Sequence, residues 1–315
     1  MTLKRFVVEA LAEAHATGRP GAAFADDVAW HAVHPMNDLA GKAAVERAVL
    51  APLRAAFPDL ERRDDIAIES VFRGEAWVAL TGHVCGTFAA DLHGLPATGG
   101  LAFLRTAEFA RVADGRIVEV VAFHDLVDLM RQAGCSPLPP SAGVDLLIPG
   151  PRTRDGVVLD RVDPIEGARS VALVEAMIAG LMAYDGASLA SMGQERFWAP
   201  DMLWFGPGGI GSNRRLKGFQ DFHQRPFLTA FPDRRGGNHK ARVGDGAYVA
   251  SAGWPSIQAT HAGPYLGAPA TNRRITMRVS DFWRAENGCL AENWVFIDIP
   301  DLFLHPTEHL RTKGG

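Results

Sequence analysis

Asp298 is the side chain of this sequence best placed for acid–base chemistry. A strand leading up to it would carry four side chains on one face: Glu292, Trp294, Phe296 and Asp298. A carboxylate beside aromatic rings loses hydration, which raises its pKa toward the value that a general base needs near neutral pH. The alternative is that Asp298 caps a helix beginning just after it, which the nearby Pro300 would suit.

Two other polar side chains could act with this carboxylate. His261 could polarise a carbonyl group or carry a proton, or it could instead fix the loop Thr260–Gly267 through backbone hydrogen bonds. Asp281 falls on an apolar face of its strand, so it is either an acid in a pocket or a paired charge in the core. Arg278 lies three residues earlier, on the opposite face. Together with Arg105 it predicts a structural salt bridge in each half of the chain.

Aromatic residues could line a pocket for a planar or fatty ligand near these polar groups. The candidates are Trp204, Trp254, Tyr265 and Trp294, each of which could equally be core packing. A second pocket in the first half of the chain would use Trp30, His83, Glu108 and Asp125. His31 and His34 have a spacing found in metal sites, but no third ligand has a known position, so no metal is predicted.

An internal repeat decides how these residues are positioned. Asp201–Trp204 matches Asp27–Trp30 at an offset of 174 residues. An offset of 173 then aligns further identical residues: Thr87 with Thr260, Gly94 with Gly267, Arg105 with Arg278, Glu119 with Glu292 and Asp125 with Asp298. Chance does not maintain such a register over about 100 residues, a period too long for a solenoid. The chain is therefore predicted to be a tandem duplication.

Each copy reads as helices followed by antiparallel strands. The first domain is predicted over residues 1–134 and the second over 166–315, joined by a proline- and glycine-rich linker over 135–165. In the first copy, apolar spacing predicts a helix over Val7–His15 and another over Ala43–Phe57, which Pro52 should kink or split. A curved sheet closed by helices leaves an apolar cone, a common place for a small-molecule site.

Composition excludes several classes of partner. The 315-residue chain has a net charge of -4 and no basic block, so nucleic acid is not expected. No run approaches the roughly 20 apolar residues needed to span a bilayer, and the N-terminus lacks the pattern of a signal peptide. Three cysteines without CxxC spacing favour free thiols in a reducing compartment, so a cytoplasmic protein is expected.

The segment from Thr260 to Thr271, which reads THAGPYLGAPAT, resembles the signature of the SnoaL-like polyketide cyclases, also called ester cyclases. Three further matches support the resemblance: Ala199-Pro200-Asp201, Phe231-Pro232-Asp233 and the run from Trp283 to Gly288. The first copy departs from the signature at Phe88, where histidine is usual. The second departs at Asn272, where glycine is usual.

This resemblance implies an α+β fold with two NTF2-like domains, each a curved antiparallel sheet with helices. Because single units of this superfamily usually form homodimers, the two copies are expected to pack as a pseudo-dimer within one chain, which could dimerise further. The second domain, with the better-preserved motif, is expected to hold the active pocket.

The resemblance also implies cyclase chemistry, of the aldol type or a related lyase or isomerase reaction, without cofactor or metal. The expected substrate is a small hydrophobic carbonyl compound. In this reading Asp298 removes a proton next to the carbonyl, and His261 stabilises the enolate oxygen or returns the proton. One alternative is a binding module without chemistry, for a small molecule or a protein. Another is a hydrolase or dehydratase that uses the same residues.

Overall fold

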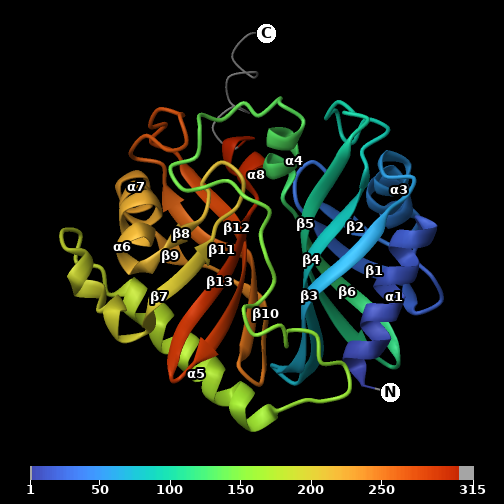
Figure 1. Cartoon of the computed structure of the whole chain (residues 1–315), viewed down its shortest axis with the longest axis horizontal. Coiled ribbons are helices and arrows are strands. Elements are labelled where there is room, and N and C mark those ends of the chain that lie inside the picture. Colours follow the sequence, from blue (N-terminus) through green and yellow to red (C-terminus); the bar gives the residue numbers. More distant parts are fainter. Residues whose placement is uncertain (1, 305–315) are drawn as a thin grey trace. The chain divides into compact units, whose positions relative to one another are not determined.

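The computed structural model describes residues 2–304, which form two compact units (Figure 1). The first unit comprises the chain through Ser136 together with Leu147–Pro164 and Val243–Gly246. The second comprises Pro137–Leu146, Ile165–Arg242 and the chain from Ala247 onward. Residues of the predicted linker are thus divided between the two units. The predicted end of the second domain, over 305–315, lies outside the described residues.

The first domain opens with helix α1 (Leu3–Thr17). Thr2 caps its start by accepting a hydrogen bond from the Arg5 amide, and Gly18 ends it in a left-handed conformation with φ 73°. The strands are β1 (Phe24–Ala32), β2 (Asp38–Ala40), β3 (Glu61–Phe72), β4 (Glu75–Thr87), β5 (Leu101–Ala113) and β6 (Arg116–His124). The remaining helices are α2 (Lys42–Val45), α3 (Ala51–Ala56) and α4 (Leu126–Gln132).

The helix predicted over Ala43–Phe57 is split, as Pro52 indicates. A π-helical turn over Glu46–Leu50 separates α2 from α3, and Pro52 lies in the first turn of α3. Proline has no backbone N–H and displaces the carbonyl one turn earlier, so a wider turn there relieves the clash.

The sheet of the first domain has the order β2-β1-β6-β5-β4-β3. Strands β3 to β6 form the predicted antiparallel meander, but β1 pairs with β6 in parallel. The sheet is therefore mixed. The long connection between β1 and β6 makes this parallel pairing possible, because strands β2 to β5 lie between them in the sequence.

The second domain repeats this plan. Its helices are α5 (Pro164–Met182), α6 (Arg215–Phe219), α7 (Arg225–Ala230) and α8 (Ile299–Leu304), with 3-10 turns at Leu189–Met192 and Gln194–Arg196. Its strands are β7 (Trp198–Phe205), β8 (Asn213–Arg214), β9 (Arg235–Gly236), β10 (His239–Asp245), β11 (Tyr248–Thr260), β12 (Arg274–Glu286) and β13 (Cys289–Ile297). They follow the order β10-β11-β12-β13-β7-β8, with β7 parallel to β13 and β9 paired to β11.

Local irregularities recur at equivalent places in the two sheets. A π-helical turn, Gln220–Gln224, again precedes a helix with proline in its first turn. The register also shifts after Arg111 in β5 and after Arg284 in β12. These shared departures from regular geometry support the duplication predicted from the sequence.

Two carboxylates occupy the same register position in the two sheets. Glu108 on β5 lies opposite Ala122, and Asp281 on β12 lies opposite Val295. Their surroundings differ, because Asp281 lines a cavity and Glu108 pairs with Arg62. Within the described part of the chain, no helix has the length and apolarity needed to cross a bilayer.

Candidate active site

A cavity of about 230 Å³ opens inside the second domain. Its wall is mostly apolar, with side chains from α5, the α6–α7 region and strands β11 to β13, among them Met177, Leu181, Phe227, Ile257, Val279 and Val295. A few polar side chains also line it: His223, Gln224, Arg234, His239, Ser256, Asp281 and Asn293. An apolar hollow with a small number of polar groups is the usual form of a small-molecule site.

Asp281 is the carboxylate of this cavity. Alternation along β12 places four side chains on the cavity wall: Met277, Val279, Asp281 and Trp283. Burial in this apolar setting raises the pKa of Asp281 to about 7, although a hydrogen bond from Asn293 and the charge of Arg242 oppose the shift. Both protonation states are therefore populated near neutral pH, as a group that takes up and returns a proton requires.

Asn293 orients this carboxylate from the neighbouring strand β13. Its Nδ2 donates to the backbone oxygen of Phe282 at 3.0 Å and to Oδ1 of Asp281 at 3.3 Å. The bond to a backbone carbonyl, which can only accept, fixes the amide so that its N–H groups face Asp281. Asn293 therefore holds the carboxylate in place and favours its ionised form.

Two nitrogen atoms near the cavity have no hydrogen-bond partner among the described residues: Nδ1 of His223 and Nε1 of Trp283. The His223 ring stacks on Trp204, with centroids 4.4 Å apart and planes at 21°. Burial lowers the pKa of His223 to about 3, so the imidazole is neutral at physiological pH. Unpartnered buried polar atoms are uncommon in proteins and often mark functional positions.

Asp298 lies outside the cavity wall and is fully engaged elsewhere. One oxygen of its buried carboxylate accepts a hydrogen bond from Arg278 Nη1 at 3.1 Å, and the other accepts from the Asp301 amide at 3.2 Å. The second bond caps helix α8, which was the alternative considered for Asp298. This placement does not support the catalytic role predicted for Asp298.

The predicted structural salt bridge is present in both domains. Arg278 pairs with Asp298, and in the first domain Arg105 pairs with Asp125 at 3.1 Å. Asp125 also caps α4 by accepting a hydrogen bond from the Asp128 amide. The residue predicted to serve a second pocket thus performs the same capping function as its counterpart.

His261 is buried in its loop rather than on the cavity wall. Its Nδ1 lies 3.2 Å from the Thr271 hydroxyl, and its backbone oxygen accepts hydrogen bonds from the amides of Thr271 and Asn272. Burial lowers the pKa of its imidazole. These contacts fit the loop-fixing alternative.

Of the four predicted aromatic wall residues, the cavity contains Trp204. Trp254 stacks against the Arg278 guanidinium, 4.4 Å from its ring centroid. Trp294 packs on Phe205 with ring centroids 5.4 Å apart. Tyr265 lines a separate hollow of about 190 Å³ that includes Pro139 and Pro140. These three aromatic rings therefore lie away from the wall that carries Asp281.

The face of β13 explains why Trp294 is displaced. The cavity is lined by Asn293, Val295 and Ile297, the alternate set to Trp294 and Asp298. Nearly every residue of β13 is buried, so both of its faces are covered. Alternation alone could not identify which face meets the cavity.

The equivalent region of the first domain contains buried aromatic and charged side chains. Trp30 and Trp77 are almost completely buried, and His83 lies 3.5 Å from Asp65. Glu108, at the position of Asp281, is 1% exposed and forms an ion pair with Arg62. Glu108 is therefore buried and ion-paired through one oxygen, whereas Asp281 is half-buried and faces a cavity.

His15 and His124 also approach Glu108. Burial lowers the pKa of both imidazoles, that of His124 to about 4. Burial opposes ionisation of Glu108 as well, but the charge of Arg62 holds the pKa of that carboxyl below its usual value. The cluster thus combines two neutral imidazoles with a carboxylate.

Several residues of these two sites were not identified from the sequence: Arg62, His15, His124, His223, Arg234 and Asn293. Asn293 lies on a strand already recognised, but it alternates with Trp294 and both faces of that strand are buried, so alternation did not single it out. His223 lies in the π-helical turn Gln220–Gln224, where the usual helical spacing does not apply.

A family model described as SnoaL-like polyketide cyclase matches residues 2–133 and 187–303 of the chain. Among solved structures, the chain is similar to AclR of Streptomyces galilaeus, with 22% identity, 45% of this chain and 83% of that chain covered, and a TM-score of 0.36. It is also similar to IdmH of Streptomyces antibioticus, with 23% identity and a TM-score of 0.36. The match covers 42% of this chain and 99% of IdmH. An NTF2-like protein of Burkholderia xenovorans matches at 16% identity, with 44% and 97% covered and a TM-score of 0.35. No curated protein matches the chain.

Proposed function

Because the chain belongs to the SnoaL-like polyketide cyclase family, we propose that its second domain binds a small hydrophobic carbonyl compound and moves a proton within it without a cofactor. The two matched regions lie within the two α+β domains. The repeat predicted a tandem duplication, and the resemblance implied that both copies are NTF2-like domains. The observation that carries the proposal is the half-buried carboxylate of Asp281 on the wall of an apolar cavity, with its pKa raised to about 7.

In the proposed reaction, ionised Asp281 removes a proton from the carbon next to the substrate carbonyl. The electron pair of that C–H bond moves to the carbonyl oxygen, giving an enolate. In an aldol closure, the enolate carbon then attacks a second carbonyl of the same molecule. One C–C bond forms, and the new alkoxide takes the proton back from Asp281. An isomerase would return the proton to a different carbon.

The enolate requires hydrogen-bond donors that are already in place. His223 and Trp283 both line the cavity, and each has a buried ring nitrogen, named above, without a partner among the described residues. A neutral imidazole can donate a hydrogen bond to an enolate through its N–H, as neutral histidines do in other active sites. The flat rings of Trp204 and Trp283 would suit a planar substrate.

The roles of Asp298 and His261 follow from their contacts. We assign Asp298 to capping and charge pairing, and His261 to holding its loop, because neither lines the cavity. Asp281, which was predicted as a pocket residue, takes the acid–base role in this proposal.

The test uses a simple ketone whose α-protons exchange measurably with solvent. Wild-type protein should accelerate exchange of deuterium from D₂O into 2-tetralone, followed by mass spectrometry or proton NMR. Asp281→Asn should reduce this rate by at least about 100-fold, because proton transfer by a positioned base contributes about 10²–10⁴-fold. The affinity for the ketone, measured by quenching of tryptophan fluorescence, should change by no more than a few fold.

Asp298→Asn serves as the matched control, since it removes a carboxylate of the same domain that does not line the cavity. It should retain most of the exchange activity per folded molecule. Full activity in Asp281→Asn would refute the assignment. Ketone binding without exchange in wild type would favour the binding-module alternative.

A further inference from the structure

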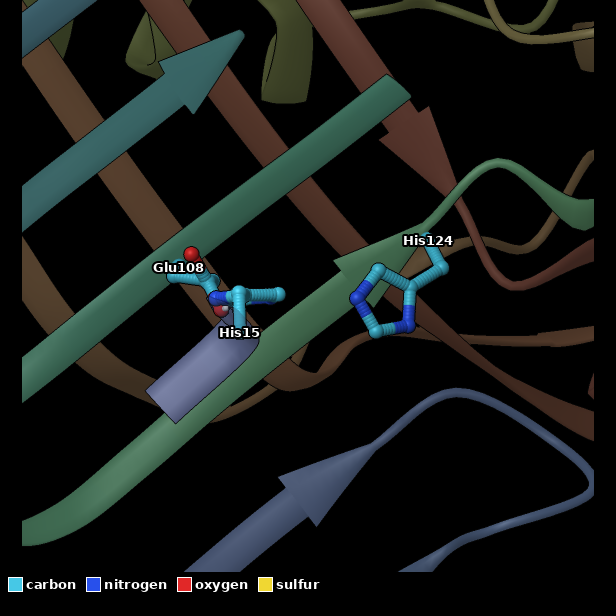
Figure 2. Close-up of side chains that lie close together, drawn as sticks. All are labelled: His15, Glu108 and His124. Atoms are coloured by element: carbon cyan, nitrogen blue, oxygen red, sulfur yellow. Dashed lines mark ion pairs between the residues drawn. The ribbon is translucent and has the colours of Figure 1, made fainter. Parts of the chain in front are cut away.

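The first domain contains a buried cluster that the proposed reaction does not use. His15 comes from α1, Glu108 from β5 and His124 from the end of β6 (Figure 2). Their relative exposures are 1%, 1% and 7%. One ligand atom from each lies within 4.8 Å of the others. Three elements that are far apart in the sequence thus bring two imidazoles and a carboxylate to one point.

Each of these side chains has an unsatisfied atom in the cluster. Nε2 of His15, Oε1 of Glu108 and Nε2 of His124 are buried, and none has a hydrogen-bond partner within residues 2–304. Buried polar atoms nearly always have a partner, which can be protein, water or an ion. Because these three atoms lie close together, a single bound ion or water could contact all of them.

The hydrogen bonding of His15 indicates what is missing. Its Nδ1 lies 2.8 Å from the backbone oxygen of Leu11, which can only accept, so this nitrogen carries the proton. In a neutral ring Nε2 then has a lone pair, and it faces Oε1 of Glu108 at 3.6 Å. Two acceptors that face each other need a cation or a donor between them.

The opposite tautomer satisfies the cluster less well. Nδ1 of His15 would then accept from Arg62 Nη1 at 3.2 Å, and the proton would sit on Nε2. That proton would still face Glu108 across 3.6 Å, which is longer than a hydrogen bond. Nε2 of His124 would also remain without a partner.

From this geometry we propose that His15, Glu108 and His124 bind a divalent transition-metal ion, such as zinc, inside the first domain. Two neutral imidazoles and one carboxylate form a donor set that zinc and iron(II) accept, with a further position left for water. Metal-bound histidines commonly donate their other N–H to a backbone carbonyl, as His15 does to Leu11. Bound metal would tie helix α1 to strands β5 and β6.

The charges around the cluster are compatible with a divalent ion. Arg62 is the cation beside it and pairs with Oε2 of Glu108, which leaves Oε1 directed at the two imidazoles. Asp64 pairs with Arg62 at 2.8 Å and offsets its charge. Arg62, Asp64 and Glu108 together carry one net negative charge, and Arg62 acts as the outer partner that orients the ligating carboxylate.

Metal analysis of the full-length protein tests the site. The purified chain is stripped with a chelator, incubated with zinc chloride, desalted and analysed by mass spectrometry for bound metal. Wild type should retain about one zinc per chain, and its thermal midpoint should rise with zinc. Glu108→Gln and His124→Gln should each weaken zinc binding by at least about tenfold. His83→Gln, which changes an equally buried histidine outside the cluster, should bind as wild type does.

Nuclear magnetic resonance of the wild-type imidazoles keeps the test independent of variant folding. Zinc should shift the ring nitrogens of His15 and His124 and leave those of His83 unchanged. The proposal is overturned if stripped wild type retains less than a tenth of an equivalent of zinc. It is also overturned if Glu108→Gln or His124→Gln binds zinc as tightly as wild type, or if zinc shifts only other histidines.

Discussion

At the scale of single residues, the surroundings of a carboxylate decide its chemistry. Asp281 and Asp298 both belong to the second domain, and both are removed from bulk water. Asp298 accepts hydrogen bonds from a guanidinium and a helix amide, which favour the ionised form. Asp281 has one amide donor and an apolar wall, which favour the neutral form. Ionisation of Asp281 therefore destabilises the folded protein. The same burial raises its pKa, which makes the carboxylate a stronger base.

This cost predicts how stability depends on pH. The pKa of Asp281 is about 7 in the folded protein and 3.8 as the reference for an exposed carboxyl, so between these values the folded state holds a proton that the unfolded state has lost. Stability contributed by the group is thus present at low pH and is lost as pH rises toward 7. Asp281→Asn should stabilise the protein more at pH 8 than at pH 5, by on the order of 1 kcal/mol, measured by urea unfolding.

Asp221 provides a control of opposite sign. Lys217 and Arg225 hold the pKa of its carboxyl below the usual value, so Asp221→Asn should not stabilise the protein at pH 8. A stability gain for Asp281→Asn that is independent of pH would contradict the raised pKa.

At the scale of elements, equivalent strands and helices in the two domains share helix caps, ion pairs and π-helical turns. They differ in the side chains around the central carboxylate. In both domains an aspartate follows the last strand of the meander and caps the next helix. It also pairs with an arginine on the preceding strand of the sheet. Both also break a helix at a π-helical turn. The devices that define the fold were retained in the two copies, and the groups around the central carboxylate were not.

The shared cap predicts similar effects in the two domains. Asp298→Ala and Asp125→Ala should each destabilise the protein by about 1–3 kcal/mol, because each removes a helix cap and an ion pair with an arginine. Asp298→Asn and Asp125→Asn should lose less stability than the alanine variants, since asparagine also caps helices. Differential scanning calorimetry measures both pairs. A loss of ketone exchange in well-folded Asp298→Asn would instead support the catalytic role first predicted for that residue.

At the scale of the whole chain, duplication has given two domains of one fold with different interiors. The second encloses a cavity of about 230 Å³, whereas the first places Trp30, Trp77 and an ion-paired Glu108 in its core. We therefore assign the organic ligand to the second domain and the metal to the first.

This division predicts one organic ligand per chain. Titration of the protein with 2-tetralone, followed by calorimetry or native mass spectrometry, should give a stoichiometry near one. Val279→Phe, which narrows the cavity, should weaken binding by at least about tenfold, because overpacking an apolar site is unfavourable. Val71→Phe on the exposed face of β3 should leave it unchanged. Two equivalent sites per chain would contradict the assignment.

The sequence predicted the fold, and it drew attention to some of the residues that line the cavity. Identical residues at a constant offset identified the duplication, and alternation around Asp281 placed it on an apolar face, where the cavity lies. The pseudo-dimer, the cytoplasmic location and the exclusion of nucleic acid stay predictions.

The remaining features depend on information that local sequence does not contain. Both faces of β13 are buried, so alternation could not separate Asn293 from Trp294. His223 lies within a π-helical turn, where the regular helical spacing does not apply. The metal-binding cluster forms only when α1 packs near β5 and β6, which brings together His15, Glu108 and His124. The spacing of these residues in the sequence does not predict that contact.

The most direct test of the central claim is the pH dependence of deuterium exchange into 2-tetralone catalysed by the wild-type protein. If Asp281 is the base, the rate should rise with pH and level off with a midpoint near 7, since only the ionised carboxylate accepts a proton. The same curve should be absent in Asp281→Asn. A midpoint near 4, or a curve unchanged in that variant, would show that another group transfers the proton.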